Sequence, residues 1–184
     1  MTIPNMITIL RFLLVPAVVY CLLEGSVGWA LACFLVAGIS DGVDGFIARH
    51  FNQRSTLGAY LDPMADKVLL VSTFLVLGLM RELPLWLVVL AVSRDLLILA
   101  AVLLSTIMGH PVTVRPLFVS KANTAMQIVL VAAVLGELAF AADVGWLRES
   151  LVYLSGALTA ASAAAYLVAW LKHMAGYAES DTPD

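Results

Sequence analysis

Charge is scarce in this sequence. Only 12% of its 184 residues are Asp, Glu, Lys or Arg, whereas 62% are hydrophobic, and the mean hydropathy is +0.99. Such a composition excludes an ordinary soluble domain and is typical of one membrane domain that crosses the bilayer several times. The formal net charge of −3 is too small to point to any particular partner.

Cysteine is scarce as well. The chain has only Cys21 and Cys33, both inside apolar runs, where cysteine usually serves as a small core side chain. Two such residues predict neither a disulfide framework nor a cysteine metal site. No basic segment precedes the first apolar run, which argues against a cleaved signal peptide. No transit segment precedes Ile3, which favours a bacterial inner (plasma) membrane over a mitochondrial one.

Long hydrophobic runs, separated by short polar, glycine or proline breaks, make up most of the chain. We expect six transmembrane helices, because about 20 apolar residues span a bilayer core of ~30 Å. Pro63 suits the first turn of the third helix. The expected bounds are 1–24, 28–49, 61–80, 85–108, a fifth helix reaching to about 142, and 146–171.

The predicted fold class is therefore an all-α polytopic membrane protein. One domain covers residues 1–175, and an acidic tail over residues 176–184 is expected to be disordered. Most basic residues fall on the side of the termini and of the loops after the second and fourth helices, so that side should face the cytoplasm, or the matrix in an organelle. They are Arg11, Arg49, Arg54, Lys67, Arg115, Lys121 and Lys172.

Four aspartates stand out in residues 41–66. Asp41 and Asp44 are three positions apart, and Asp62 and Asp66 are four apart, so each pair falls on one face of a helix if the segments are helical. A charge inside the bilayer costs ~2.5–3.5 kcal/mol, and clustered carboxylates repel one another. A divalent cation would remove both penalties, and an all-oxygen ligand set favours Mg²⁺, Mn²⁺ or Ca²⁺ over Zn²⁺ or Cu²⁺. We therefore expect an intramembrane acidic metal site near the cytoplasmic side, suited to a bound pyrophosphate.

Small residues accompany these acids. Gly45 and Ala48 lie on the same helical stripe as Asp41, which allows the close approach of either a flat ligand or a neighbouring helix. Both readings stay open from the spacing. Arg49 follows at the helix end, where it could bind an anionic oxygen.

The pattern Asp-x-x-Asp-Gly-x-x-Ala-Arg, then eight residues, then Gly-x-x-x-Asp-x-x-x-Asp resembles the signature of the CDP-alcohol phosphatidyltransferase family. The chain matches all of its fixed positions. The resemblance implies a homodimeric membrane enzyme in which an acceptor alcohol displaces CMP from a CDP-linked lipid. The matching residues are Asp41, Asp44, Gly45, Ala48, Arg49, Gly58, Asp62 and Asp66.

The same resemblance implies roles for these residues. Asp41, Asp44 and Asp62 would bind one or two Mg²⁺ or Mn²⁺ ions that hold the pyrophosphate of CDP-diacylglycerol. Asp66 would be the general base and the fourth carboxylate of the metal site. Three small residues would accommodate the nucleotide and one arginine its phosphates, namely Gly45, Ala48, Gly58 and Arg49.

The second half of the chain bears on the acceptor. Ser93-Arg94-Asp95, Arg115 and the polar residues of 120–127 and 159–166 resemble the mitochondrial-type cardiolipin synthases. Phosphatidylglycerophosphate synthases usually have Ala-Arg-Glu and Gly-Lys-x-Lys-Thr at the corresponding places. We therefore expect phosphatidylglycerol as the acceptor, with glycerol 3-phosphate as the alternative. Its phosphate would be bound by Arg94, Arg115 and Lys121.

Two other readings remain. Arg94 and Asp95 could form a structural ion pair inside the membrane, and an intramembrane acidic cluster would also suit a divalent-cation transporter. Transporters often repeat their binding helices in two halves. The sequence has no second copy of the acidic segment after residue 81, which makes the transporter the weaker hypothesis.

Overall fold

The computed structural model describes residues 3–50, 56–107 and 118–180, with side chains described for 9–40, 64–107 and 118–174. These ranges form six helices. They are α1 (Ile3–Leu23), α2 (Val27–His50), α3 (Thr56–Leu79), α4 (Leu85–Ile107), α5 (Phe118–Phe140) and α6 (Gly145–Ser180).

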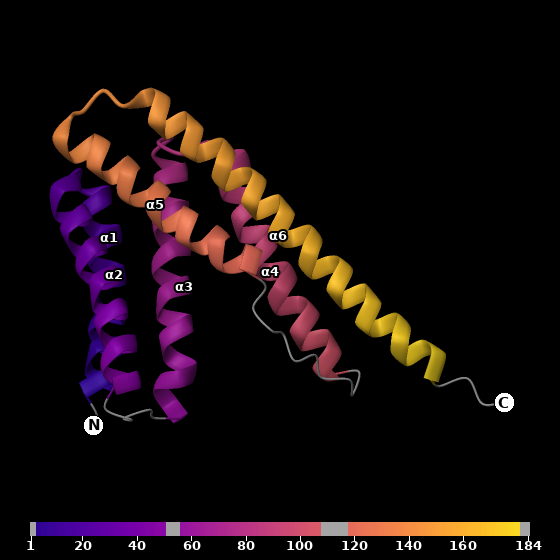
Figure 1. Cartoon of the computed structure of the whole chain (residues 1–184). Coiled ribbons are helices and arrows are strands. Elements are labelled where there is room, and N and C mark those ends of the chain that lie inside the picture. The colour runs from indigo at the N-terminus through magenta and orange to yellow at the C-terminus, as the bar shows by residue number, and fades with distance from the viewer. Residues whose placement is uncertain (1–2, 51–55, 108–117, 181–184) are drawn as a thin grey trace.

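Successive helices run in alternating directions (Figure 1). The C-terminal end of α2 and the N-terminal end of α3 therefore lie at the same end of the molecule, together with the start of α1. Helix α1 packs against α2 and α3, α5 packs against α2 and α6, and α4 packs against α6. Helix α5 crosses the first three helices obliquely and so links them to the α4–α6 pair.

The connections at the opposite end are tight. Between α1 and α2, Gly25 has a φ of 74°, a left-handed conformation that glycine adopts without strain. The backbone N–H of Ser26 donates to the carbonyl of Cys21 at 2.8 Å. Arg81 has a φ of 63° and closes α3 in a similar way. These short turns force the paired helices to run antiparallel.

Small and aliphatic side chains fill the core. Val18 and Leu22 of α1 are fully buried, and so are Ala30 of α2 and Leu77 of α3. Helix α5 adds a buried stripe at helical spacing. Its members are Leu130, Val131, Val134 and Leu135.

Much apolar surface remains exposed on the outside. Leu79, Leu99, Ile107 and Phe118 are among the large side chains open on the surface. Within the part of the chain whose side chains are described, three helices are long and apolar enough to cross a membrane, and shorter apolar stretches cover Ile9–Leu23 and Val27–Ser40. This is the surface of an integral membrane protein. The three are Leu85–Ile107, Phe118–Phe140 and Gly145–Met174.

Helix bounds predicted from the apolar runs agree with the structure to within three residues at most ends. Two predictions were wrong. Helix α3 begins at Thr56 instead of about 61, so Pro63 lies inside it and not in its first turn. Helix α6 continues to Ser180 instead of ending at about 171. No proline lies between Gly145 and Pro183, so nothing forces the earlier stop. Cys21 and Cys33 are both free thiols.

Candidate active site

The aspartate pairs lie near the ends of two helices, and these ends are at the same end of the molecule. Asp41 and Asp44 belong to α2, and Asp62 and Asp66 belong to α3, so both segments are helical as the spacing predicted. Of the four, only Asp66 has a described side chain. Side-chain predictions that fall outside the described residues concern Asp41, Asp44, Gly45, Ala48, Arg49, Gly58, Asp62 and Arg115.

Asp66 is tied to the first helix. Its Oδ1 accepts a hydrogen bond of 2.5 Å from the guanidinium of Arg11. Arg11 is only 1% exposed, whereas the side chain of Asp66 is 42% exposed. From the sequence, Arg11 was counted only among the basic residues of the predicted cytoplasmic side, and this contact was missed. An arginine inside an apolar run was the available signal.

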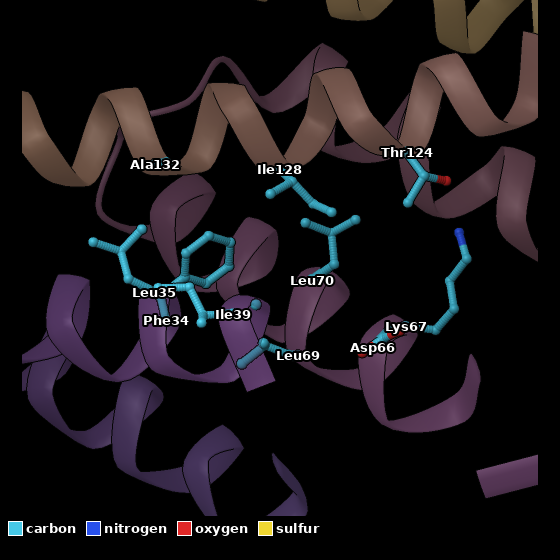
Figure 2. A pocket seen from close by; sticks show the side chains of 11 residues that line it. Phe34, Leu35, Ile39, Asp66, Lys67, Leu69, Leu70, Thr124, Ile128 and Ala132 are labelled. Carbon is cyan, nitrogen blue, oxygen red and sulfur yellow. The ribbon is translucent and has the colours of Figure 1, made fainter. Parts of the chain in front are cut away.

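A cavity of about 510 Å³ opens beside Asp66, between α2, α3 and α5. Figure 2 shows Phe34, Leu35 and Ala132 toward one end, and Asp66 and Lys67 toward the other, where Lys67 extends toward Thr124 of α5. Most of the lining is aliphatic. A long apolar space with a few polar groups at one end suits a lipid. The lining residues are Phe34, Leu35, Gly38, Ile39, Asp66, Lys67, Leu69, Leu70, Thr124, Ile128 and Ala132.

Lys67 connects this cavity to α4. Its Nζ donates to both carboxylate oxygens of Asp95 at 2.8 Å. The Oδ1 of Asp95 also accepts a hydrogen bond of 2.6 Å from Arg94. The carboxylate of Asp95 is thus shared by two cations. Since Arg11 bonds Asp66, the ion pairs described here join α1 to α3 and α3 to α4.

In the second half of the chain, Arg94 of α4 bonds side chains of several helices. Its side chain is 2% exposed, and its Nε and both terminal nitrogens all have partners. It donates to Ser162 of α6 at 2.7 and 3.1 Å and to Ser120 of α5 at 2.5 Å. Its guanidinium carbon lies 5.6 Å from the centre of the Tyr166 ring, within the range of a cation–π contact. Arg94 therefore ties α4 to both α5 and α6.

A buried polar seam continues along α5 and α6. The Oγ1 of Thr159 lies 2.8 Å from the Oδ1 of Asn123 and 2.7 Å from the carbonyl oxygen of Ser155. Gln127 donates to the same hydroxyl at 3.4 Å. All four residues are buried. Hydrogen bonds of this kind fix how two helices pack in a membrane.

These contacts bear on the predicted acceptor site. The residues that carried the resemblance to cardiolipin synthases form an interhelical network, and Arg94 is committed to it. Lys121, by contrast, is exposed on α5, and Arg115 lies outside the described residues. Within the side chains that are described, no cluster of three or more metal-binding groups occurs.

A helical membrane protein with a carboxylate at the polar end of an apolar cavity is compatible with an enzyme that acts on lipids. Comparison with protein families gives the narrower class. The CDP-alcohol phosphatidyltransferase model matches residues 1–172. This chain belongs to that family.

Several relatives carry one name. The chain is 38% identical over 155 residues to the human cardiolipin synthase (CMP-forming), covering 76% of this chain and 52% of that protein. It is 34% identical over 184 residues to a probable cardiolipin synthase (CMP-forming) of Drosophila melanogaster, covering 91% and 57%. A putative cardiolipin synthase of Mycobacterium tuberculosis is 42% identical over 99 residues, covering 53% and 47%. The chain thus spans about half the length of these relatives.

Proposed function

We propose that the chain is a CMP-forming cardiolipin synthase, which transfers a phosphatidyl group from CDP-diacylglycerol to phosphatidylglycerol. The observation that carries the proposal is the cavity between α2, α3 and α5. Its apolar length suits a lipid chain, and its polar end holds the Asp66 carboxylate. The names of the relatives support the same reaction.

In this reaction a hydroxyl of phosphatidylglycerol attacks the phosphorus that bears the diacylglycerol, and the bond to CMP breaks. Asp66 is the general base that accepts the hydroxyl proton as the new bond forms, because an alcohol ionises too weakly at pH 7 to react unaided. The hydrogen bond from Arg11 orients this carboxylate. Its 42% exposure leaves it accessible from the cavity.

Asp41, Asp44, Asp62 and Asp66 would hold one or two Mg²⁺ or Mn²⁺ ions. Support comes from the two helices, whose acidic segments lie at the same end of the molecule, and from Asp66, which stays accessible although it bonds Arg11. Carboxylate oxygens are the ligands these ions prefer. When bound, the ions would neutralise the pyrophosphate and stabilise the leaving CMP.

Of the remaining site residues, some would bind the donor lipid, CDP-diacylglycerol, and others the acceptor lipid, phosphatidylglycerol. Gly45, Ala48 and Gly58 would accommodate the nucleotide of the donor, and Arg49 would bind its phosphates. For the acceptor phosphate, exposed Lys121 and Arg115 are the candidates for direct contact. The buried contacts of Arg94 favour a role through its neighbours, because a direct contact would require these hydrogen bonds to exchange.

We further propose six transmembrane helices in a bacterial inner membrane, with the α2–α3 end facing the cytoplasm, and a homodimer. The even number of helices supports termini on one side. The concentration of basic residues at that end supports the cytoplasmic orientation.

The test supplies purified protein with CDP-diacylglycerol, Mg²⁺ or Mn²⁺, and either phosphatidylglycerol or glycerol 3-phosphate, and follows CMP and the lipid products. We expect cardiolipin from phosphatidylglycerol and a rate at least about 100-fold lower for Asp66→Asn, the range typical of a lost general base. The exchange of carboxylate for amide keeps the size of the side chain.

Other outcomes select other functions. If the product were phosphatidylglycerophosphate made from glycerol 3-phosphate, the phosphatidyl transfer would stand, but the acceptor would be glycerol 3-phosphate instead of phosphatidylglycerol. No CMP release with either alcohol would reject the transferase. Divalent-cation flux into proteoliposomes without CMP release would favour the transporter.

A further inference from the structure

The Lys67–Asp95 ion pair differs from the other ion pair at the cavity in its charge balance. Arg11 and Asp66 form one cation and one anion. Asp95, in contrast, is the single carboxylate bonded to both Lys67 and Arg94. Among Lys67, Arg94 and Asp95, whose side chains are all described, two cations share one carboxylate. This set of three groups therefore carries one net positive charge.

The excess charge resides on Lys67. Arg94 is 2% exposed and donates to Ser120 and Ser162 as well as to Asp95. The side chain of Lys67 is 40% exposed and lines the cavity. An ammonium group has three donors, and Asp95 accepts two at 2.8 Å each. The third donor is available for a ligand.

We propose that Lys67 binds the phosphodiester of the acceptor lipid and that Asp95 is the positioning residue that fixes its ammonium group. This inference rests on the proposed function and extends it to residues outside the predicted acceptor set. The phosphodiester carries one negative charge, which matches the excess. Its apolar chain would occupy the aliphatic part of the cavity, lined by Phe34 and Leu70. Thr124, toward which Lys67 extends in Figure 2, supplies a hydroxyl beside the same site.

The network gives Asp95 its rigidity. Arg94 is held by α5 and α6, and Asp95 is held by Arg94, so the position of Lys67 on α3 depends on three other helices. Lys67 follows the base, Asp66, directly in the sequence, and both side chains line the cavity. A phosphodiester bound there would keep the acceptor headgroup close to the carboxylate that removes its proton.

The test measures KM separately for phosphatidylglycerol and CDP-diacylglycerol with Lys67→Met, Lys67→Arg and Asp95→Asn. For Lys67→Met we expect KM for phosphatidylglycerol to rise about 10- to 100-fold, the value of a charge-assisted hydrogen bond, with KM for CDP-diacylglycerol within about twofold. Lys67→Arg keeps the charge and should recover most of the affinity. Asp95→Asn should lie in between. Lys172→Met, which removes an exposed lysine of α6, is the matched control.

A purely structural ion pair gives a different result. It would lower the apparent melting temperature and the rate with both lipids alike, and the KM for phosphatidylglycerol would stay unchanged in Lys67→Met. Either that result or a rise in KM for CDP-diacylglycerol alone would overturn the assignment.

A binding measurement separates this failure from failure of the proposed function. Native mass spectrometry would count phosphatidylglycerol and phosphatidylcholine retained by wild-type and Lys67→Met protein. We expect a preference for phosphatidylglycerol that is lost in the variant. If the wild type releases no CMP but shows this preference, the anion site stands and the reaction is wrong. Equal retention of both lipids by the wild type would reject the site.

Discussion

Arg11 and Asp66 lie 55 positions apart in the sequence and are joined by a hydrogen bond of 2.5 Å. A buried arginine of the first helix thereby orients the carboxylate that we assign as the base. The bond joins α1 to α3, and α1 also packs against α2, the other helix that carries the acidic motif.

Replacing Arg11 with Met should therefore impair both activity and stability. We expect CMP release to fall at least about tenfold and the free energy of unfolding to drop by about 1.5–3 kcal/mol, the value of a hydrogen bond to a charged group. Arg81→Met, at an exposed arginine of the opposite end, is the control and should leave both unchanged. Wild-type rates in Arg11→Met would show that Asp66 does not need this partner.

Removal of divalent metal should abolish the reaction. Treatment with a chelator is expected to stop CMP release, and Mg²⁺ or Mn²⁺ added in excess should restore it, because the charge on the pyrophosphate would otherwise oppose attack. Asp62→Asn should raise the metal concentration needed for half-maximal activity. Full activity after chelation would show that the reaction does not need a divalent ion.

The helices were predictable from the sequence because long apolar runs and their breaks are local features. Most ends agree to within three residues. The start of α3 was not predicted correctly, because proline is typical of a first helical turn, yet Pro63 lies well inside this helix. Local rules give a preference at such positions, and the full chain decides the boundary.

The partners of the polar residues were only partly predictable. The spacing of the four aspartates placed each pair on one helix, which the structure confirms. The bond between Arg11 and Asp66, and the contacts of Arg94 with Ser162, join helices that are far apart in the sequence. No period or motif encodes such pairings. Arg94 was assigned to the acceptor because an arginine in a membrane indicates function, and the ion-pair alternative describes its contacts better.

The buried seam between α5 and α6 predicts a specific cost for losing one hydroxyl. Thr159→Val keeps the shape of the side chain but leaves Asn123 and Gln127 without this partner. We expect a loss of about 1–3 kcal/mol in the free energy of unfolding. Thr106→Val is the matched control, because Thr106 is exposed and bonds only its own helix at Val102. Its effect should stay within about 0.5 kcal/mol. If Thr159→Val and Thr106→Val changed thermal unfolding equally, the hydrogen bonds of Thr159 would not stabilise the packing of α5 on α6.

Contact between α4 and α6 depends on Gly156. A Cβ added there would lie 2.7 Å from two ring atoms of Trp86. The indole also stacks on Tyr153 of α6, whose ring centre is 6.1 Å away. Gly156→Ala should therefore force the helices apart and cost about 1–3 kcal/mol, as overpacking usually does.

Gly136→Ala is the control for this substitution. Among the described residues nothing lies within 4 Å of a Cβ added at Gly136, so alanine should stabilise α5 by about 0.5–1 kcal/mol through its better helix propensity. Opposite shifts in apparent melting temperature are the expected outcome. Gly156→Ala should also slow CMP release, because α6 carries Ser162, the hydroxyl that holds Arg94. A melting temperature raised by both variants would mean that Trp86 does not pack on Gly156.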